Sequence, residues 1–426
     1  MSGPPPSSRR RANLVAVGVL VVAVLGVLLV VRAGDDDAAP SRPSSAAIAD
    51  GADDVSRERV LAAQVRALGE AWDARSADRF ATAAGTSTRA GAFARQTFAA
   101  LTALDVRGVD LRLVDTLGGT SPDVVEAAVA VSWTPAPRLG PSLPTDEAEV
   151  TLSFRRGAQA RTWDLESAGP GDGPVPLWLA GAVQVVPVDD AEVVAVGTSP
   201  TVTGRVRALV RRGVEQVTRT LPDASRAPVV VAPTSTAVAA ALLGEDTASL
   251  APLAAVTSTP DGRASTATGS VVVLNPEVFA RLDERDAQLV VTHELTHALS
   301  EVPWRAPLWV VEGFADWVAL GDDDRSPREV ASALLTRVRD QGAPDELPTA
   351  AEFTASADGL GATYEAAWLV FVVLQELGTP QDVVAFYEDV RDGAAVGPAL
   401  ERRFGVDEQQ LLGRWQRYLR EQSARS

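Results

Sequence analysis

The chain has 426 residues, enough for two or three folded units, and its 56 acidic side chains against 39 basic ones give a net charge of −17. This charge argues against nucleic acid and anionic lipid as partners. The chain has no cysteine, which excludes disulfides, thiolate metal sites and lipid attachment through a cysteine.

The amino-terminal region predicts a membrane anchor. Residues 14–31 are all apolar or glycine, and a helix of that length spans roughly 27 Å, about the thickness of a hydrocarbon core. Arginines at 9–11 precede this segment and aspartates at 35–37 follow it. The positive-inside rule therefore places residues 1–13 in the cytoplasm and the rest of the chain outside the cell membrane. A cleaved signal peptide is the alternative, but the apolar run is long for one.

Residues 32–55 are rich in Asp, Ala, Pro and Ser and predict a flexible linker. From Ser56 the apolar residues recur at helical spacing, and the following segments alternate as strands do. Helices followed by antiparallel strands predict an α+β unit over residues 56–170.

Within that unit, Leu68-x-x-x-Trp72 is followed by Asp78-Arg79-Phe80. With its order of elements, this stretch resembles the cone-like domains of the nuclear-transport-factor-2-like group. The resemblance implies either a small-ligand or catalytic cone, or a structural and interaction module. The unit contains no histidine and no evident acid/base pair, so we expect a module between the membrane and the rest of the chain.

A Gly- and Pro-rich loop at 169–174 predicts a boundary, and residues 175–426 form the second unit. Its expected elements are strands at 191–196, 229–231 and 271–274, and helices at 202–221, 236–243 and from about 283 to a point before Pro303. From Pro307 onward every strong pattern is helical. The sequence therefore predicts an α+β fold with a small sheet lobe and a helical lobe.

The segment His293-Glu294-Leu295-Thr296-His297 lies in the last of the helices expected in the sheet lobe, and its two histidines are the only ones in the chain. Positions i and i+4 share one helix face, so both imidazoles can reach one metal ion. Glu294 can then act on a water beside that ion as a general base. Two ordinary core or surface histidines are the alternative, because the five-residue pattern recurs by chance.

A catalytic zinc keeps three protein ligands, and with two histidines the third must be a carboxylate. The segment Trp309 to Trp317 supplies Glu312 and Asp316 at i and i+4 among aromatic residues. We expect Glu312 to bind one Zn²⁺ per chain and Asp316 to accept the outer N–H of a ligand histidine. An exposed acidic helix face is the alternative.

His293-Glu294-x-x-His297 followed by Trp309-x-x-Glu312-Gly313-x-Ala315-Asp316 resembles the gluzincin zinc metallopeptidases, in particular the peptidase MA-like branch. The metzincin pattern fails, because no Gly lies three residues after His297 and no third His exists. The resemblance implies a thermolysin-like domain over roughly residues 185–420. It also implies His293, His297 and Glu312 as ligands, Glu294 as base and an acidic partner at Asp316.

Tyr364 matches a tyrosine that stabilises the oxyanion in aminopeptidase relatives, although the Gly of that pattern is Ala367 or missing here. Packing of Tyr364 on the core is the alternative. The exopeptidase signature Gly-Ala-Met-Glu-Asn is absent.

The sequence thus predicts a membrane-anchored, extracytoplasmic zinc metallopeptidase that hydrolyses a peptide or protein. Residues Ser265–Leu274 are expected to supply an edge strand that pairs with an extended peptide. The alternative is a non-catalytic scaffold or sensor with a metallopeptidase-like fold, which binds zinc or a peptide without turnover.

Overall fold

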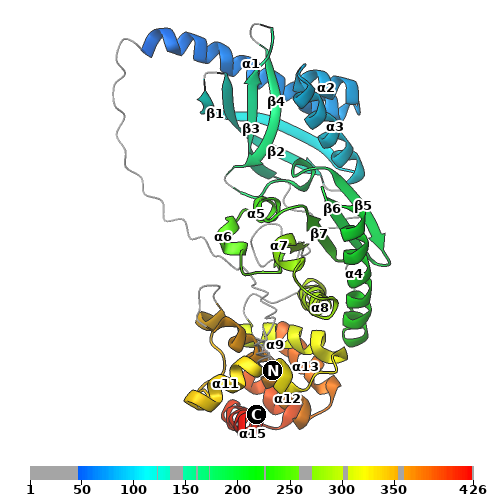
Figure 1. Ribbon diagram of the computed structural model, residues 1–426, viewed down its shortest axis with the longest axis vertical. Helices are drawn as coiled ribbons and strands as arrows, with labels where there is room; N and C mark the ends of the chain where they lie inside the picture. Colours follow the sequence, from blue (N-terminus) through cyan, green and yellow to red (C-terminus); the bar gives the residue numbers. More distant parts are fainter. Residues whose placement is uncertain are drawn as a thin grey trace, which may run out of the picture.

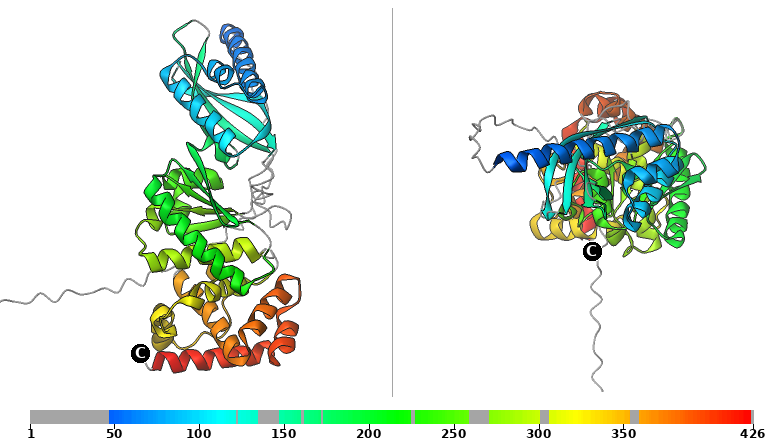
Figure 2. Two further views of the ribbon diagram at one scale, coloured as in Figure 1. Left: turned by 90° about the vertical axis from the view of Figure 1, so that its right-hand side faces the viewer. Right: turned by 90° about the horizontal axis from the view of Figure 1, so that it is seen from above.

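The computed structural model describes residues 47–121, 123–134, 147–159, 162–171, 173–224, 227–258, 271–300, 306–353 and 359–424. They build an elongated molecule of three stacked parts: an amino-terminal α+β unit, a lobe around a second sheet, and a helical lobe that holds the carboxy-terminal helix (Figure 1). Figure 2 shows the same order from the side. The predicted mixed α+β class, with two small sheets, is confirmed. The anchor predicted at residues 14–31 and the tail at 1–13 lie outside the described residues.

Three helices open the amino-terminal unit: α1 (Ala47–Asp73), α2 (Ala77–Ala84) and α3 (Thr88–Ala103). Ser76 and Ser87 cap α2 and α3, because each hydroxyl accepts a backbone N–H of the first turn. The flexible linker predicted over residues 32–55 is wrong in its last part, since α1 already begins at Ala47. That part is rich in alanine, which has the highest helix propensity, and the Asp content hid this signal.

The first sheet is antiparallel in the order β1-β2-β3-β4, and one face packs against the helices. Its strands are β1 (Arg107–Ser121), β2 (Val124–Thr134), β3 (Glu147–Arg156) and β4 (Trp163–Pro170). Register shifts of β1 against β2 interrupt the alternation of its side chains, so the strand is longer than a simple alternating pattern indicates. The described order of helices and strands agrees with the predicted α+β unit.

The boundary loop predicted at 169–174 overlaps the last two residues of β4 and is followed by a short 3₁₀ helix, η2 (Leu177–Leu179), whose three residues are all buried. The Trp178 ring packs edge-on against Trp133 of β2, with 6.2 Å between ring centroids. Helix α3 also contacts η2 and the first strand of the next sheet. The two units therefore share an apolar contact rather than a solvated linker.

The second sheet has the strand order β5-β6-β7-β9-β8, with β6, β7 and β9 parallel and an antiparallel strand at each edge. The strands are β5 (Val183–Val188), β6 (Ala191–Val196), β7 (Val229–Pro233), β8 (Ala255–Ser258) and β9 (Val271–Leu274). β6, β7 and β9 were predicted and are confirmed. β5 and β8 were missed, because β5 is a half-buried edge strand containing a proline and β8 has only four residues.

The edge strand predicted at Ser265–Leu274 is wrong in its described part. β9 pairs with β7 on one side and with β8 on the other, so it is an interior strand. Its run of four buried apolar residues is typical of a strand covered on both faces. The edge on this side of the sheet, among the described strands, is β8. Residues 265–270 lie outside the described residues.

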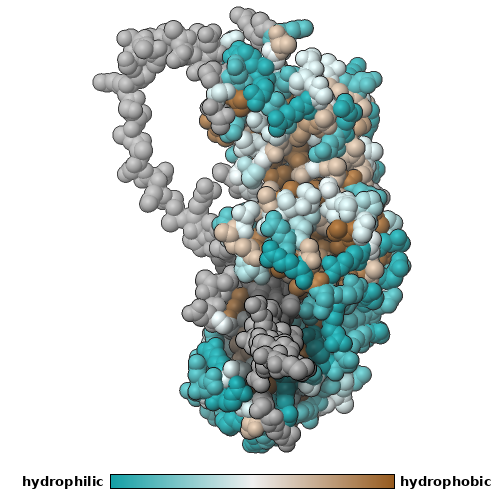
Figure 3. Space-filling model, viewed as in Figure 1, coloured by the Kyte–Doolittle hydropathy of each residue, from teal (hydrophilic) through white to brown (hydrophobic). Residues whose placement is uncertain are grey.

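The helices of the sheet lobe are α4 (Pro200–Thr220), α5 (Thr236–Leu243), α6 (Thr247–Leu250), α7 (Pro276–Phe279) and α8 (Glu284–Ser300). α4 lies close against α8, and a Cβ at Gly213 would be only 2.7 Å from the Leu295 side chain. Arg205 and Arg212 of α4 form ion pairs with Glu284 at the start of α8, and Arg211 pairs with Asp189. Figure 3 shows hydrophilic residues along this side of the molecule. α4 therefore holds α8 against the sheet while its other face meets solvent.

The helical lobe consists of α9 (Leu308–Ala319), α10 (Pro327–Val330), α11 (Ser332–Gln341), α12 (Leu360–Leu377), α13 (Pro380–Arg391), α14 (Val396–Phe404) and α15 (Glu408–Ala424), with short 3₁₀ turns between. Its core is aromatic, and Phe314 stacks on Tyr387 with 3.8 Å between centroids. Among the described helices, α12 alone is long and apolar enough to cross a membrane, and most of it is buried inside the molecule.

Candidate metal centre

The His-Glu-x-x-His motif lies on α8, where the sequence predicts a helix. The helix begins after Asp283, whose carboxylate accepts the Asp286 N–H at 2.9 Å, and acidic residues in its first turn suit the positive end of the helix dipole. α8 is covered by α4, β8 and α9, so His293 and His297 are 0% and 2% exposed. Buried imidazoles require polar partners, and the partners come from α9.

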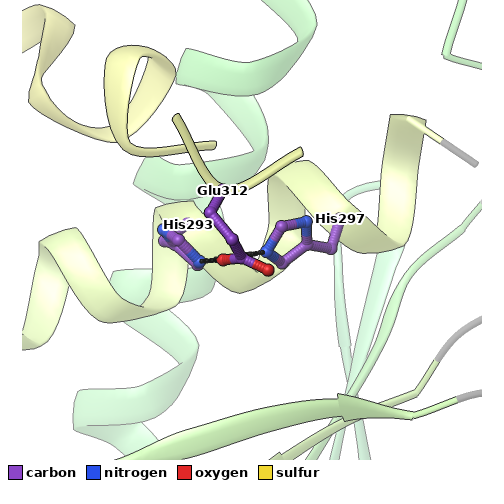
Figure 4. A group of neighbouring side chains, drawn as sticks. All are labelled: His293, His297 and Glu312. Atoms are coloured by element: carbon purple, nitrogen blue, oxygen red, sulfur yellow. Dashed lines mark hydrogen bonds and ion pairs between the residues drawn. The ribbon is translucent and has the colours of Figure 1, made fainter. Parts of the chain in front are cut away.

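Glu312 reaches from α9 to a point between the two imidazoles (Figure 4). The His293 and His297 Nε2 atoms are 2.9 Å apart, and the Glu312 Oε2 atom lies 3.2 Å and 3.4 Å from them, respectively. A tetrahedral zinc with bonds of about 2.0–2.1 Å requires ligand atoms about 3.3 Å apart. The three atoms therefore form a triangle close to one face of such a tetrahedron.

Asp316 holds the other side of His293. Its Oδ1 atom lies 2.7 Å from the His293 Nδ1 atom, in a buried hydrogen bond. A carboxylate at that position accepts a hydrogen bond from the Nδ1–H group, so the neutral ring presents the Nε2 lone pair to the Glu312 side. The structure thus places Asp316 where the sequence analysis expects the partner of a ligand histidine.

The charges of the cluster alter the pKa values of its members. Burial alone would raise the pKa of Glu312, but the two imidazoles outweigh it and lower the pKa to about 2. Burial opposes protonation of His293, yet Asp316 and Glu312 raise its pKa well above the usual value. Both directions reflect carboxylates and imidazoles that face one another in a medium of low dielectric. A cation at this point would meet an ionised carboxylate.

Glu294 lies on the same helix but does not join the triangle. Its Oε2 atom accepts the Thr257 hydroxyl proton from β8 at 2.5 Å, and burial raises the pKa of its carboxyl above the usual value. The Oε1 atom is buried and has no hydrogen-bond partner among the described residues. This atom is free to accept a proton from a small molecule beside the triad.

The donor set fits a divalent metal ion. Glu312 Oε1 and His297 Nδ1, like Glu294 Oε1, are buried without a hydrogen-bond partner among the described residues. Among those residues, His293, His297 and Glu312 form the one group of acidic and imidazole side chains able to hold a metal. Two nitrogens and one oxygen, with no sulfur, suit Zn²⁺ and also the ferrous ion of two-histidine, one-carboxylate sites.

The close contact of α9 with α12 places Glu312 in the site. A Cβ at Gly313 would be only 2.6 Å from the Ala367 carbonyl oxygen and 2.8 Å from the Phe371 ring. The glycine therefore lets the two helix backbones approach, and the neighbouring Glu312 side chain turns toward α8. The Glu-Gly pair in the sequence has a steric reason.

Tyr364, at the start of α12, is also near the triad. Its ring centroid lies 6.2 Å from that of His293 and 5.3 Å from that of Phe353. Burial, followed by the nearby carboxylates, raises the pKa of its phenol well above the usual value, so the hydroxyl keeps its proton. Tyr364 lies beside the site and, among the described residues, makes no hydrogen bond to the triad, which is compatible with both predicted roles.

Sequence reasoning missed Thr257. It lies 37 positions before Glu294, on a strand that was not predicted, and no local motif connects the two residues. A threonine within an apolar strand was the available signal.

No protein-family model matches this chain, and no curated protein matches its sequence.

Proposed function

We propose that this protein is a zinc-dependent metallopeptidase. The observation that carries the proposal is the convergence of three buried ligand atoms beside a buried carboxylate with one unpartnered oxygen. A metal-binding scaffold requires only the triad, whereas hydrolysis also requires a base at Glu294. The resemblance of the two motifs to the gluzincins supports the same reaction.

When bound at His293, His297 and Glu312, a zinc ion would supply Lewis acidity and lower the pKa of a water ligand. Glu294 then accepts the proton of the attacking water through Oε1 and later delivers it to the leaving amine. Asp316 keeps His293 in the tautomer that presents Nε2. Tyr364 keeps a protonated hydroxyl near the triad, as a donor to the oxyanion that forms from the peptide carbonyl.

The proposed substrate is an extended peptide or protein segment. β8 is an edge of the second sheet among the described strands, and it lies against α8 beside the motif. An extended chain can add to such an edge through main-chain hydrogen bonds, which brings a scissile bond near the triad without requiring a particular side chain.

We further propose that a single-pass membrane anchor holds the enzyme at the outer surface of the cell membrane. The support is the apolar run at residues 14–31 with arginines before it and aspartates after it. In cells, a protease added from outside should remove the second unit and leave residues 1–13 protected. Loss of an amino-terminal tag under the same treatment contradicts this orientation.

The test of the activity uses the full chain, purified in detergent without added metal. Elemental analysis should find one zinc per chain, and a library of internally quenched peptides should be cleaved. Glu294→Gln should retain the zinc and lose cleavage by about 10²–10⁴-fold, the usual contribution of a general base. Cleavage that survives this substitution, or a chain that holds no zinc, contradicts the mechanism. A zinc-loaded wild type that cleaves nothing supports the scaffold instead.

A further inference from the structure

Thr257 is the one buried polar residue of β8, the strand next to the motif helix. Thr257 is 6% exposed and lies opposite Val272 of the neighbouring strand β9. Its buried companions in β8 and β9 are alanine, valine and leucine. A valine would fill the same volume in such a strand, so the hydroxyl itself needs an explanation.

The hydroxyl is directed at Glu294. Oγ1 is 2.5 Å from the carboxylate Oε2 atom and 3.2 Å from the backbone carbonyl oxygen of the same residue. Both distances lie within hydrogen-bond reach, and the carboxylate oxygen is the nearer acceptor. The hydroxyl has one proton, so the carboxylate is its principal acceptor and the carbonyl a secondary one.

We propose that Thr257 is a positioning residue that fixes the Glu294 carboxylate by one oxygen and leaves Oε1 to receive the proton of the attacking water. This inference rests on the proposed metallopeptidase function. Glu294 has several rotatable bonds, and a base that is held before the reaction loses less freedom in the transition state. The hydroxyl belongs to the strand to which we assign the peptide, so one element aligns both base and substrate.

The first experiment compares kinetic constants on a cleaved peptide from the quenched library. Thr257→Val keeps the shape and removes the hydroxyl, and should lower kcat by about 10–100-fold with KM within about twofold. Thr257→Ser restores the hydroxyl and should return kcat to within about threefold of the wild type. Zinc content should stay at one per chain in both variants, because Thr257 touches no ligand.

Thr203→Val is the matched control. Thr203 is 5% exposed on α4, and its hydroxyl donates to the Ser199 carbonyl oxygen at 3.0 Å, away from the triad. This variant loses a buried hydroxyl of the same kind and should keep the wild-type kcat. An equal loss of kcat in Thr203→Val and Thr257→Val overturns the inference, because it reduces the effect to general destabilisation.

A second experiment detects the hydrogen bond between Thr257 and Glu294 through thermal stability, without an activity assay. In chelator, Thr257→Val should lower Tm by roughly 2–4 °C. In a chain that carries Glu294→Met, which removes the carboxylate acceptor at similar volume, the same substitution should lower Tm by less than half as much, because only the secondary bond to the backbone carbonyl remains. Equal Tm shifts in both chains overturn the inference, because the hydroxyl would then serve only the backbone carbonyl.

The failure of this inference can be told apart from the failure of the proposed function. A wild-type chain that cleaves peptides beside a Thr257→Val chain with the same kcat overturns the positioning role and leaves the enzyme standing. A wild-type chain that cleaves no peptide overturns the proposed metallopeptidase function, whatever the Tm measurements show.

Discussion

The two units of this chain bury charge for different purposes. In the described part of the amino-terminal unit, Asp164 is the one buried charged residue. Its Oδ1 atom accepts the backbone N–H groups of Thr86 and Ser87 at 2.6 Å and 3.2 Å, just before α3. Gly85 is required beside it, because its φ is +131° and a Cβ there would be 2.2 Å from that oxygen. This charge joins β4 to a helix start and, within the described part of the chain, leaves no buried oxygen of Asp164 without a partner.

In the second unit, four buried or nearly buried charged groups lie around one point. Glu294, Glu312 and Asp316 face His293, and two of these carboxylates keep a buried oxygen without a partner among the described residues. Burying such groups costs free energy that helix packing alone does not recover. Under the proposed function, burial of a charge does not by itself mark a site, whereas the convergence of unpartnered atoms does.

The most direct test of this difference between the two units is to neutralise one buried charge in each. Glu312→Gln removes the anionic ligand, so the chain should no longer bind one zinc ion. The cleavage rate should then fall by more than about 10³-fold. Zinc content by elemental analysis and cleavage of the peptide library measure the two losses.

Asp164→Asn is the partner experiment in the amino-terminal unit. The amide keeps an acceptor oxygen but loses the charge, so the unfolding free energy should fall by about 1 kcal/mol with zinc and cleavage unchanged. Zinc loss in this variant, or zinc retention in Glu312→Gln, contradicts the division of roles between the two units.

Asp316 should give a smaller effect, because it acts through His293. Asp316→Asn keeps the shape and weakens the hydrogen bond to Nδ1, so zinc affinity should fall by about 10–100-fold. Competition with a fluorescent chelator measures this Kd. An affinity equal to the wild type would mean that Asp316 has only a packing role, like a buried residue of the first unit.

The approach of α9 to α12 can be tested at a glycine. Gly313→Ala places a Cβ against the Ala367 carbonyl oxygen, a backbone atom that cannot swing aside, and should lower the unfolding free energy by about 1–3 kcal/mol. Zinc affinity should fall too, because α9 carries Glu312. Urea unfolding and zinc titration measure the two effects.

Gly204→Ala is the matched control, since a Cβ at this exposed position of α4 meets nothing within 4 Å. It should stabilise the helix by up to about 1 kcal/mol. Similar losses in both alanine variants would show that the glycines act through the helix backbone and not through the contact between α9 and α12.

The sequence predicts those parts of the site that have local patterns. Helical spacing places the motif histidines on one face, and Glu312 and Asp316 follow from the same spacing on the next helix. Buried apolar strands such as β7 are visible as runs of valine. These features depend on near neighbours in the chain, which is why they can be read without the fold.

Contacts between distant segments were not predictable in the same way. Thr257 meets Glu294 only because β8 closes the edge of the sheet, and the four residues of β8 carry no alternation. The edge was assigned to the β9 segment, since a run of apolar residues does not reveal its number of partners. The helical start of α1 was hidden by a composition typical of linkers.

Glu365 tests the comparison through the pH dependence of stability. It lies in the second unit, but like Asp164 its carboxylate accepts a backbone N–H near the start of a helix. Its carboxylate accepts the Leu334 N–H at 2.6 Å at the start of α11. Burial nonetheless raises its pKa to about 7. The folded chain thus keeps a proton that the unfolded chain loses near the usual carboxyl pKa, and stability should fall as pH rises from about 4.5 to 7.

Glu365→Gln removes this titration, so the difference in unfolding free energy between pH 5 and pH 7.5 should shrink by about 2 kcal/mol. Urea unfolding in chelator at both pH values measures it, since bound metal would add its own pH dependence. Glu346→Gln removes a carboxylate from an exposed position of the same lobe and should leave the difference unchanged. An unchanged difference in Glu365→Gln would assign the pH dependence to the buried carboxylates of the triad region. The pH dependence of the unfolding free energy would then come from the carboxylates at the metal centre and not from Glu365.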